Sequence, residues 1–343
     1  MTETITAAFY RGNKTFEVKQ IAPHAPGSEE VQIEVAYCGI CGTDLHAYLG
    51  HMDQRIGFDR ILGHEMSGTI ASVGDDVNGW QVGDRVVVRP LDPGEDNPAT
   101  ERGHSHISHN LKFLGLDSQG AMQQLWNVPA FTLHRIPESV SLRDAALIEP
   151  LAVACHDVRL SGLQPGEDVL VIGGGPIGML VAMVAKAAGG RVTISEINES
   201  RLAMAERLGF ETLNPKTTDP VAAIMEKTGD KGADVIFEVS GVQAAVDLMT
   251  EVGATRARIV MVAIHAQKPT IDLFRFFWRE LQLIGARVYE PEDYEKAIAS
   301  IAAGEIDANA MITDVRPLEK IGEAFDELGR TPTAMKSLLK ISE

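Results

Sequence analysis

Two patterns of hydrophobic positions divide the chain. In the first part, residues 31–35 alternate apolar and polar side chains, which is typical of a strand with one buried face. Glycines punctuate the following residues up to a strand expected at 85–88, and short strands separated by glycine turns favour a barrel-like β domain. Residues 91–120 are rich in turn formers and are expected to form a long loop.

After about residue 151, continuous apolar runs alternate with helical stretches. Residues 169–172 are apolar throughout, as in a parallel strand buried on both faces, and residues 177–188 have the length and composition of a helix. Asn198 and Asp219 are expected to begin two further helices. Further strands are expected at 191–195, 234–237, 257–263 and 281–285. This alternation predicts a doubly wound parallel sheet.

The tail contains two more helical patterns, at 292–303 and 318–328, with a short strand at 311–313 between them. We expect this tail to return to the first domain and complete it. The predicted organisation is an α/β chain with two domains. A catalytic domain spans 1–152 and is completed by 291–343, and a Rossmann dinucleotide-binding domain spans 153–290.

Charge and composition exclude some classes of binding partner. The 343 residues include 31 Lys and Arg against 48 Asp and Glu, and the net charge of −17 disfavours binding to nucleic acid or to an anionic membrane surface. The sequence contains neither a membrane-spanning apolar stretch nor a signal pattern, so we expect a cytoplasmic protein. Three cysteines are too few for a disulfide framework.

The glycine-rich segment after residues 169–172 predicts a dinucleotide site. It fits G-x-G-x-x-G at the mouth of a helix, whose free N–H groups favour a pyrophosphate. Glu196 ends the next strand, where a carboxylate accepts hydrogen bonds from the ribose and repels a 2′-phosphate, so we expect NAD rather than NADP. Arg201 nearby leaves some ambiguity. The expected cofactor-binding residues here are Gly173, Gly175, Pro176, Ile177, Gly178, Glu196 and Arg201.

The cysteines suggest a metal site rather than a redox pair. Cys38 and Cys41 form C-x-x-C, but no second pair of ligands follows at similar spacing, as a structural zinc knuckle requires. Cys41 combines better with His64 and Glu65, because thiolate, imidazole and carboxylate are zinc ligands and three of them leave an open catalytic position. Cys38 and Cys155 are expected to be buried small apolar residues.

Three segments together resemble the zinc-containing medium-chain dehydrogenase family, and within it the branch of sorbitol, butanediol and threonine dehydrogenases. They are Cys38-Gly39-Ile40-Cys41-Gly42-Thr43-Asp44-Leu45-His46, Gly63-His64-Glu65 and Glu149-Pro150-Leu151-Ala152-Val153. The resemblance covers nearly the whole chain, including Gly83-Asp84-Arg85-Val86 and the nucleotide glycines. It implies a GroES-like catalytic domain, one catalytic zinc ion, and a homodimer or homotetramer formed through the nucleotide domain.

The resemblance also implies roles for the metal-site residues. Cys41 and His64 are implied to be zinc ligands, while Glu65 and Glu149 compete for the third place. Asp44 is implied to hydrogen-bond the far nitrogen of His64 and to fix its tautomer.

Other residues receive a role from the same resemblance. Thr43 fits the hydroxyl that takes the proton of the substrate, and His46 fits the exit of that relay. Val239 and Ser240 are implied to contact the nicotinamide side of the cofactor. Independently of the resemblance, Tyr48, Phe58 and Phe113 are candidates for the substrate pocket, although aromatic residues more often belong to the core.

The chain departs from the family in one loop. Relatives often bind a second, structural zinc with four cysteines in the segment matched by 91–116, and this segment contains none. The corresponding positions hold approximately Pro98, Glu101, His104 and Lys112, and proline and lysine cannot replace the thiolates. We therefore expect no structural zinc, and we interpret His104, His106 and His109 as residues of a solvated loop.

The expected activity is hydride transfer between a polyol, sugar alcohol or vicinal diol and NAD. Threonine-type and simple alcohol dehydrogenase activity remain open, because specificity depends on pocket shape rather than on a motif. The intact set Cys41, His64 and Glu65 argues against a zinc-free reductase of the same superfamily. An inactive nucleotide-binding regulatory protein is the alternative from another class, and NADH production with a polyol panel would exclude it.

Overall fold

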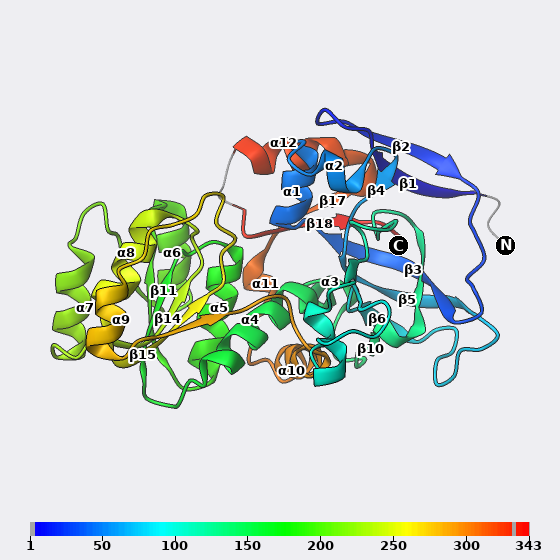
Figure 1. Ribbon diagram of the computed structural model, residues 1–343. Coiled ribbons are helices and arrows are strands. Elements are labelled where there is room, and N and C mark those ends of the chain that lie inside the picture. Colours follow the sequence, from blue (N-terminus) through cyan, green and yellow to red (C-terminus); the bar gives the residue numbers. More distant parts are fainter. Residues whose placement is uncertain (1–3, 331–333, 343) are drawn as a thin grey trace. The chain divides into compact units, whose positions relative to one another are not determined.

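The computed structural model describes residues 4–330 and 334–342, coloured along the chain in Figure 1. The chain divides into two compact units, one formed by Met1–Glu149 with Glu290–Glu343 and the other by Pro150–Tyr289. The first unit is built mostly of antiparallel strand pairs, whereas the second contains a parallel sheet.

In the first unit, β3 and β5 form the centre of the main sheet, which has the order β10-β6-β5-β3-β18-β17, with β9 also paired to β3. A smaller sheet has the order β2-β1-β4, and β7 pairs with β8. The strands are β1 (Ile5–Tyr10), β2 (Phe16–Ile21), β3 (Glu30–Gly39), β4 (Arg60–Ile61), β5 (Glu65–Val73), β6 (Arg85–Val88), β7 (Leu91–Asp92), β8 (Lys112–Phe113), β9 (Leu125–Pro129), β10 (Leu133–Arg135), β17 (Ile312–Pro317) and β18 (Lys336–Lys340). The α-helices are α1 (Gly42–Tyr48), α2 (Asp53–Ile56), α3 (Leu142–Ala145), α10 (Pro291–Ala302), α11 (Ala308–Met311) and α12 (Ile321–Arg330), and α4 (Ile148–Ser161) begins here.

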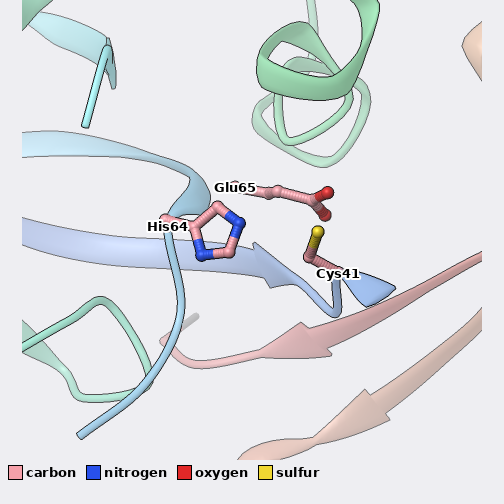
Figure 2. Close-up of side chains that lie close together, drawn as sticks. All are labelled: Cys41, His64 and Glu65. Atoms are coloured by element: carbon pink, nitrogen blue, oxygen red, sulfur yellow. The ribbon is translucent and has the colours of Figure 1, made fainter. Parts of the chain in front are cut away.

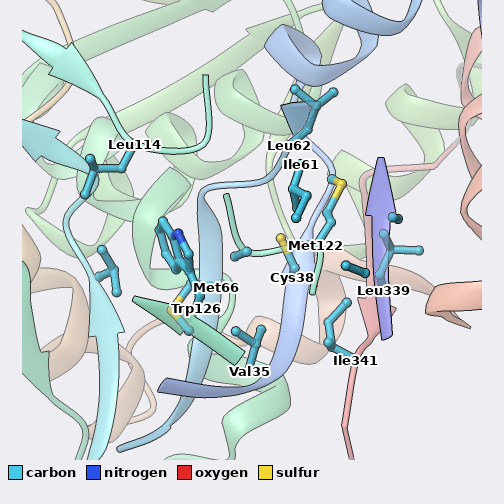
Figure 3. Close-up of a cluster of buried hydrophobic side chains, with 14 of the residues drawn as sticks. Val35, Cys38, Ile61, Leu62, Met66, Leu114, Met122, Trp126, Leu339 and Ile341 are labelled. Atoms are coloured by element: carbon cyan, nitrogen blue, oxygen red, sulfur yellow. The ribbon is translucent and has the colours of Figure 1, made fainter. Parts of the chain in front are cut away.

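The tail contributes a strand to the centre of this sheet. β18 runs antiparallel to β3 and places Leu339 opposite Cys38. Figure 3 shows the apolar cluster beneath these strands, in which Cys38 is completely buried together with Met66, Met122 and Trp126. Burying side chains of this size contributes about 1.5–3 kcal/mol each, so pairing of β18 with β3 joins segments some 300 residues apart in one core.

The second unit is organised around a six-stranded sheet of order β13-β12-β11-β14-β15-β16, in which every neighbouring pair is parallel. Its strands are β11 (Asp168–Ile172), β12 (Arg191–Ser195), β13 (Glu211–Leu213), β14 (Ala233–Glu238), β15 (Gly253–Met261) and β16 (Gln282–Gly285). Its helices are α5 (Pro176–Ala187), α6 (Glu199–Arg207), α7 (Pro220–Thr228), α8 (Gln243–Glu251) and α9 (Leu273–Arg279). In the described residues, no helix of either unit is long and apolar enough to span a membrane.

Helices cover both faces of this sheet, which confirms the expected doubly wound arrangement. Leu170 packs in one cluster with Ile224 of α7 and Met249 of α8. The next residue, Val171, points to the opposite face, where it lies beside Gly178 of α5.

Helix and strand boundaries in this unit follow the sequence signals closely. The strand expected at 191–195 is β12, and the Asn198 side chain caps α6 by accepting a hydrogen bond from the Arg201 backbone at 3.1 Å. Asp219 caps α7 in the same way. The prediction of one unstructured loop over 91–120 is wrong in part, because β7 and β8 pair across it and two 3-10 turns, Thr100–Arg102 and Ser105–Ile107, lie between them.

Candidate metal centre and nucleotide site

Cys41 lies between the end of β3 and the start of α1. Its sulfur accepts a hydrogen bond from the Thr43 backbone at 3.5 Å, while its own backbone N–H donates to Asp44 Oδ2 at 3.0 Å. These two contacts form a capping box, which satisfies donors at the helix end that would otherwise have no partner. The cap therefore fixes the direction of the Cys41 thiol.

His64 and Glu65 lie at the start of β5, directly after Gly63. A side chain at position 63 would place its Cβ 2.7 Å from the Cys38 sulfur and 2.9 Å from Met122 Cγ, and the backbone there has a φ of +99°. Only glycine fits both conditions. The Gly-His-Glu motif thus depends on the buried core cysteine, whose packing role the structure confirms.

The register of β3 and β5 brings the three expected ligands together, because Glu65 pairs with Gly39 near the end of β3. One donor atom each from Cys41, His64 and Glu65 lies within 4.8 Å of the other two. Figure 2 shows the Glu65 carboxylate directed at the Cys41 sulfur with the His64 ring beside them. The half-buried thiol of Cys41 with the buried imidazole of His64 and carboxylate of Glu65 forms a donor set that fits zinc.

Asp44 is completely buried behind His64, and its Oδ1 lies 3.6 Å from His64 Nδ1. The expected hydrogen bond between these two atoms is not formed at this distance, and both atoms are buried without a hydrogen-bond partner, so their contact is electrostatic. Burial lowers the pKa of His64, but the negative charges of Asp44, Cys41 and Glu149 outweigh it and raise this pKa well above the usual range. The metal-free site therefore attracts a cation.

Lys336, the first residue of β18, supplies one cation that the sequence did not reveal. Its Nζ lies 2.7 Å and 2.6 Å from the two oxygens of Glu65, and 3.4 Å from the Ile40 carbonyl. Lys336 and Glu65 are both buried, at 3% and 1% exposure. Burial lowers the pKa of Lys336, yet Glu65 and the neighbouring anions raise it overall, so this lysine is charged.

Glu149, the other candidate ligand, lies in the first turn of α4 and is also buried. Its charge contributes to the raised pKa values of His64 and Lys336, which indicates that it faces the same centre. Thr43 and His46 both belong to α1 and are one turn apart, hence on one face.

The three aromatic candidates for the substrate pocket lie in different environments. The Phe113 ring meets the His64 ring edge-on at 5.0 Å, so Phe113 borders the metal centre. The Tyr48 hydroxyl donates to Asp326 at 2.7 Å and its ring packs in the core, which raises its pKa to about 12. Phe58 is 61% exposed. The pocket assignment of Tyr48 is therefore wrong, because core packing uses its ring.

The histidines of the 91–116 segment do not all behave as a solvated loop. His106 is buried, and its Nδ1 lies 3.6 Å from the carboxylate of Glu290, the residue that precedes α10; His104 Nδ1 lies 4.0 Å from the same oxygen. Among the described residues, Pro98, Glu101, His104 and Lys112 do not form a common ligand cluster.

The predicted nucleotide loop joins β11 to α5. At Gly178 a Cβ would lie 1.8 Å from the Gly173 carbonyl oxygen, so the turn requires glycine there. At the neighbouring strand end, Val239 donates to the Ile172 carbonyl at 3.0 Å, and Ser240 donates to Glu238 from both its backbone and its hydroxyl. Gly175 immediately precedes Pro176 at the start of α5, and Ile177 follows it.

Glu196 follows β12 and supports this loop directly. Its carboxylate accepts hydrogen bonds from the backbone of Gly174, at 2.8 Å, and of Ile197 and Asn198, at 2.7 Å and 2.8 Å. Arg201 Nη1 lies 3.6 Å from it. Carboxylate oxygens offer about four acceptor positions, so this one holds the loop and retains capacity for another donor.

Comparison with known proteins agrees with this architecture. Residues 27–138 match the alcohol dehydrogenase GroES-like domain, and residues 176–303 match the zinc-binding dehydrogenase domain. The 2-dehydro-3-deoxy-L-galactonate 5-dehydrogenase of Pseudoalteromonas atlantica is 52% identical over 97% of this chain and 98% of its own length. The (R,R)-butanediol dehydrogenase of Neisseria gonorrhoeae is 34% identical over 89% of each chain. The crystal structure of 2R,3R-butanediol dehydrogenase from Bacillus subtilis superposes with a TM-score of 0.91 at 30% identity, covering 98% of this chain and all of the other.

The first prediction concerns Lys336. Replacing it in Lys336→Met leaves Glu65 buried without its cation, and breaking a buried pair costs about 3–5 kcal/mol of unfolding free energy. Urea unfolding of the metal-free protein measures this loss. Lys340→Met, at the exposed end of the same strand, is the matched control and should change the free energy by no more than about 0.5 kcal/mol. Equal effects of the two variants would contradict the assignment.

The second prediction concerns the proton on His64. Because its folded pKa is raised, this proton stabilises the metal-free protein below about pH 6.5, and that contribution is lost as the pH rises through the folded pKa. Zinc must displace it, so zinc affinity should increase with pH in this window. Calorimetry in buffers of different ionisation enthalpy should show a proton leaving His64 when zinc binds. Asp44→Asn should reduce the number released; an unchanged number would refute the electrostatic account.

Proposed function

This chain belongs to the zinc-dependent medium-chain alcohol and polyol dehydrogenase family, and we propose that it oxidises a secondary hydroxyl of a keto-deoxy sugar acid with NAD. It is an oxidoreductase of the polyol and diol class that uses zinc and a nicotinamide cofactor. The convergence of Cys41, His64 and Glu65 at the ends of β3 and β5 is the observation that carries the proposal.

The substrate class rests on the difference between relatives. The relative that is 52% identical is named for oxidation at position 5 of 2-dehydro-3-deoxy-L-galactonate, whereas the butanediol and sorbitol dehydrogenases are 34% and 31% identical. Each match covers most of the chain. The proposed substrate is therefore a sugar acid of this kind, and simple diols and sugar alcohols are poorer substrates.

The metal ligands follow from the donor set. Cys41, His64 and Glu65 hold the zinc ion, and the bound ion supplies Lewis acidity toward the substrate oxygen. A carboxylate oxygen of Glu65 lies within 4.8 Å of donor atoms of both Cys41 and His64, which supports Glu65 over Glu149 as the direct ligand. Lys336 contacts both oxygens of Glu65 and balances its charge. Glu149 would then contribute its negative charge without binding the ion. Asp44 Oδ1, 3.6 Å from His64 Nδ1, would favour a proton on that nitrogen and leave Nε2 to the metal.

The proton leaves along α1. Thr43 accepts the proton of the substrate hydroxyl, and His46, one turn further and exposed to solvent, carries it away.

In the second unit, the glycine loop and the start of α5 bind the pyrophosphate, Val239 and Ser240 contact the nicotinamide side, and the negative charge of Glu196 favours NAD over NADP.

The two units have separate tasks in this proposal. Residues 1–152 with 291–343 form the catalytic domain, and residues 153–290 form the dinucleotide-binding domain. The protein acts in the cytoplasm on a small-molecule substrate.

The protein assembles as a homodimer through the second unit. β16 is an edge strand of the described sheet, and α9, which contacts β15, exposes large aromatic residues. Phe277 and Trp278 are 77% and 72% exposed, and the Phe274 ring stacks on Trp278 at 5.9 Å. An edge with unpaired backbone groups beside an apolar helix fits a second copy of itself, because a two-fold axis can pair both edges.

The third prediction is a substrate ranking. Among 2-dehydro-3-deoxy-L-galactonate, sorbitol, (R,R)-2,3-butanediol and L-threonine, kcat/KM measured from NADH absorbance should be highest for the sugar acid, by at least about 100-fold, because sites built for polar groups reject analogues without them. NAD should be preferred to NADP. Cys41→Ala should lose both zinc and turnover. A higher kcat/KM for butanediol, or activity retained in Cys41→Ala, would contradict the proposal.

The fourth prediction is the oligomeric state. Light scattering should give about 74 kDa, twice the 37.1 kDa of the chain. Phe277→Asp with Trp278→Asp should yield monomers, since burying two unpaired carboxylates in an interface is costly. Phe131→Asp, at an exposed phenylalanine of the first unit, is the control and should stay dimeric. A monomeric wild type, or dimers of the double variant, would refute this interface.

A further inference from the structure

A second histidine, His51, contacts the proposed relay residue His46. Their Nδ1 atoms lie 3.1 Å apart, and the ring centroids lie 5.4 Å apart at a tilt of 38°. Both residues are exposed to solvent. The sequence alone gives His51 no role.

The end of α1 makes this contact a consequence of backbone geometry. The Gly50 backbone donates to the Ala47 carbonyl at 2.9 Å, and the His51 backbone donates to the His46 carbonyl at 3.0 Å. Gly50 has a φ of +83°. These features define a Schellman motif, in which the residue two positions after the helix cap folds back onto the last turn. An apolar pair commonly fills this contact, and here two imidazoles fill it.

The charged residues of the neighbouring α2 have other partners. Asp53 accepts a hydrogen bond from the Tyr10 hydroxyl at 2.8 Å, and Arg55 pairs with Asp117 at 2.7 Å. A Cβ added at Gly50 would lie 3.4 Å from Asp53 Oδ2, so this carboxylate faces the turn. The two imidazoles are thus free to exchange a proton with each other rather than with a carboxylate already engaged by Tyr10.

Two Nδ1 atoms at hydrogen-bond distance require one nitrogen to carry a proton and the other to accept it. We propose that His51 is the last residue of the proton relay and receives from His46 the proton that leaves the substrate hydroxyl. This inference rests on the proposed function, because it needs Thr43 and His46 in the roles given above.

The proton balance is complete within the pair. His46 begins with a proton on Nδ1 and takes the arriving proton on Nε2. It then passes its Nδ1 proton to Nδ1 of His51, and His51 releases its own Nε2 proton to water. No net charge accumulates, and the final tautomers are those that carry a proton inward when the reaction runs as a reduction.

His51 acts through His46, which predicts a non-additive pattern of variants. The rate of oxidation is measured with the substrate that the wild type oxidises fastest. His51→Gln should lower this rate about tenfold. The loss is smaller than the contribution of general acid–base catalysis, about 10²–10⁴-fold, because water replaces part of the relay. His46→Gln should lower it at least as much. The double variant should equal His46→Gln alone. Added imidazole should restore His51→Gln.

A readout specific to the proton separates this role from a structural one. Stopped-flow measurement with a pH indicator should show proton release that keeps pace with NADH formation in the wild type and lags behind it in His51→Gln. His24→Gln, at another exposed histidine of the first unit, is the control and should match the wild type. Cofactor binding, followed by NADH fluorescence, should be the same in all variants.

The outcomes distinguish the two levels of the proposal. If His46→Gln behaves like the wild type, the relay in the proposed function is wrong. If His46→Gln is slow but His51→Gln matches His24→Gln, the relay stands and the role of His51 is overturned. Additive effects of the two substitutions without imidazole rescue would also overturn it.

Discussion

The buried ion pair between Lys336 and Glu65 is the interaction on which the metal centre depends. Glu65, Asp44 and Glu149 place three carboxylates beside the Cys41 thiol in a buried region, and such a cluster repels itself unless cations balance it. Lys336 supplies one fixed positive charge from β18, and the proposed zinc ion would supply the rest. Pairing of β18 with β3 therefore both stabilises the first unit and places Lys336 at its candidate metal site.

Both candidate sites use the same construction, in which close backbone packing places polar groups at the ends of strands. Gly63 allows the chain to pass close to Cys38. His64 and Glu65 then lie at the start of β5, next to the end of β3 and the start of α1. Gly178 allows α5 to approach Gly173, and Glu196 then ties the loop to the end of β12. The glycines of both motifs are thus required by close backbone packing. The polar side chains next to them supply the chemistry.

Local signals predicted much of this fold, and long-range contacts set the limit. Asn198, Asp219 and the apolar run at 169–172 each act within a few residues, so β11, β12, α6 and α7 could be predicted almost to their ends. The short strand β13 and the helices α8 and α9 were not predicted. Cys41, His64 and Glu65 could be recognised as candidate ligands because they belong to short motifs of residue types that bind zinc. Lys336 was not recognised, since its partner lies 271 positions away and nothing near residue 336 marks it. The contact of His51 with His46 was missed because it depends on the turn at Gly50. Tyr48 was misplaced because an aromatic residue in a sequence can belong to a pocket or to the core.

The central claim is that one zinc ion is held by a single thiolate together with nitrogen and oxygen donors. X-ray absorption spectroscopy of the purified protein, with zinc measured on the same sample, tests it most directly. The account predicts about one zinc per chain, with one sulfur near 2.3 Å and the remaining ligands near 2.0–2.2 Å. A coordination shell with two or more sulfur atoms, or a fully active protein without zinc, would contradict it.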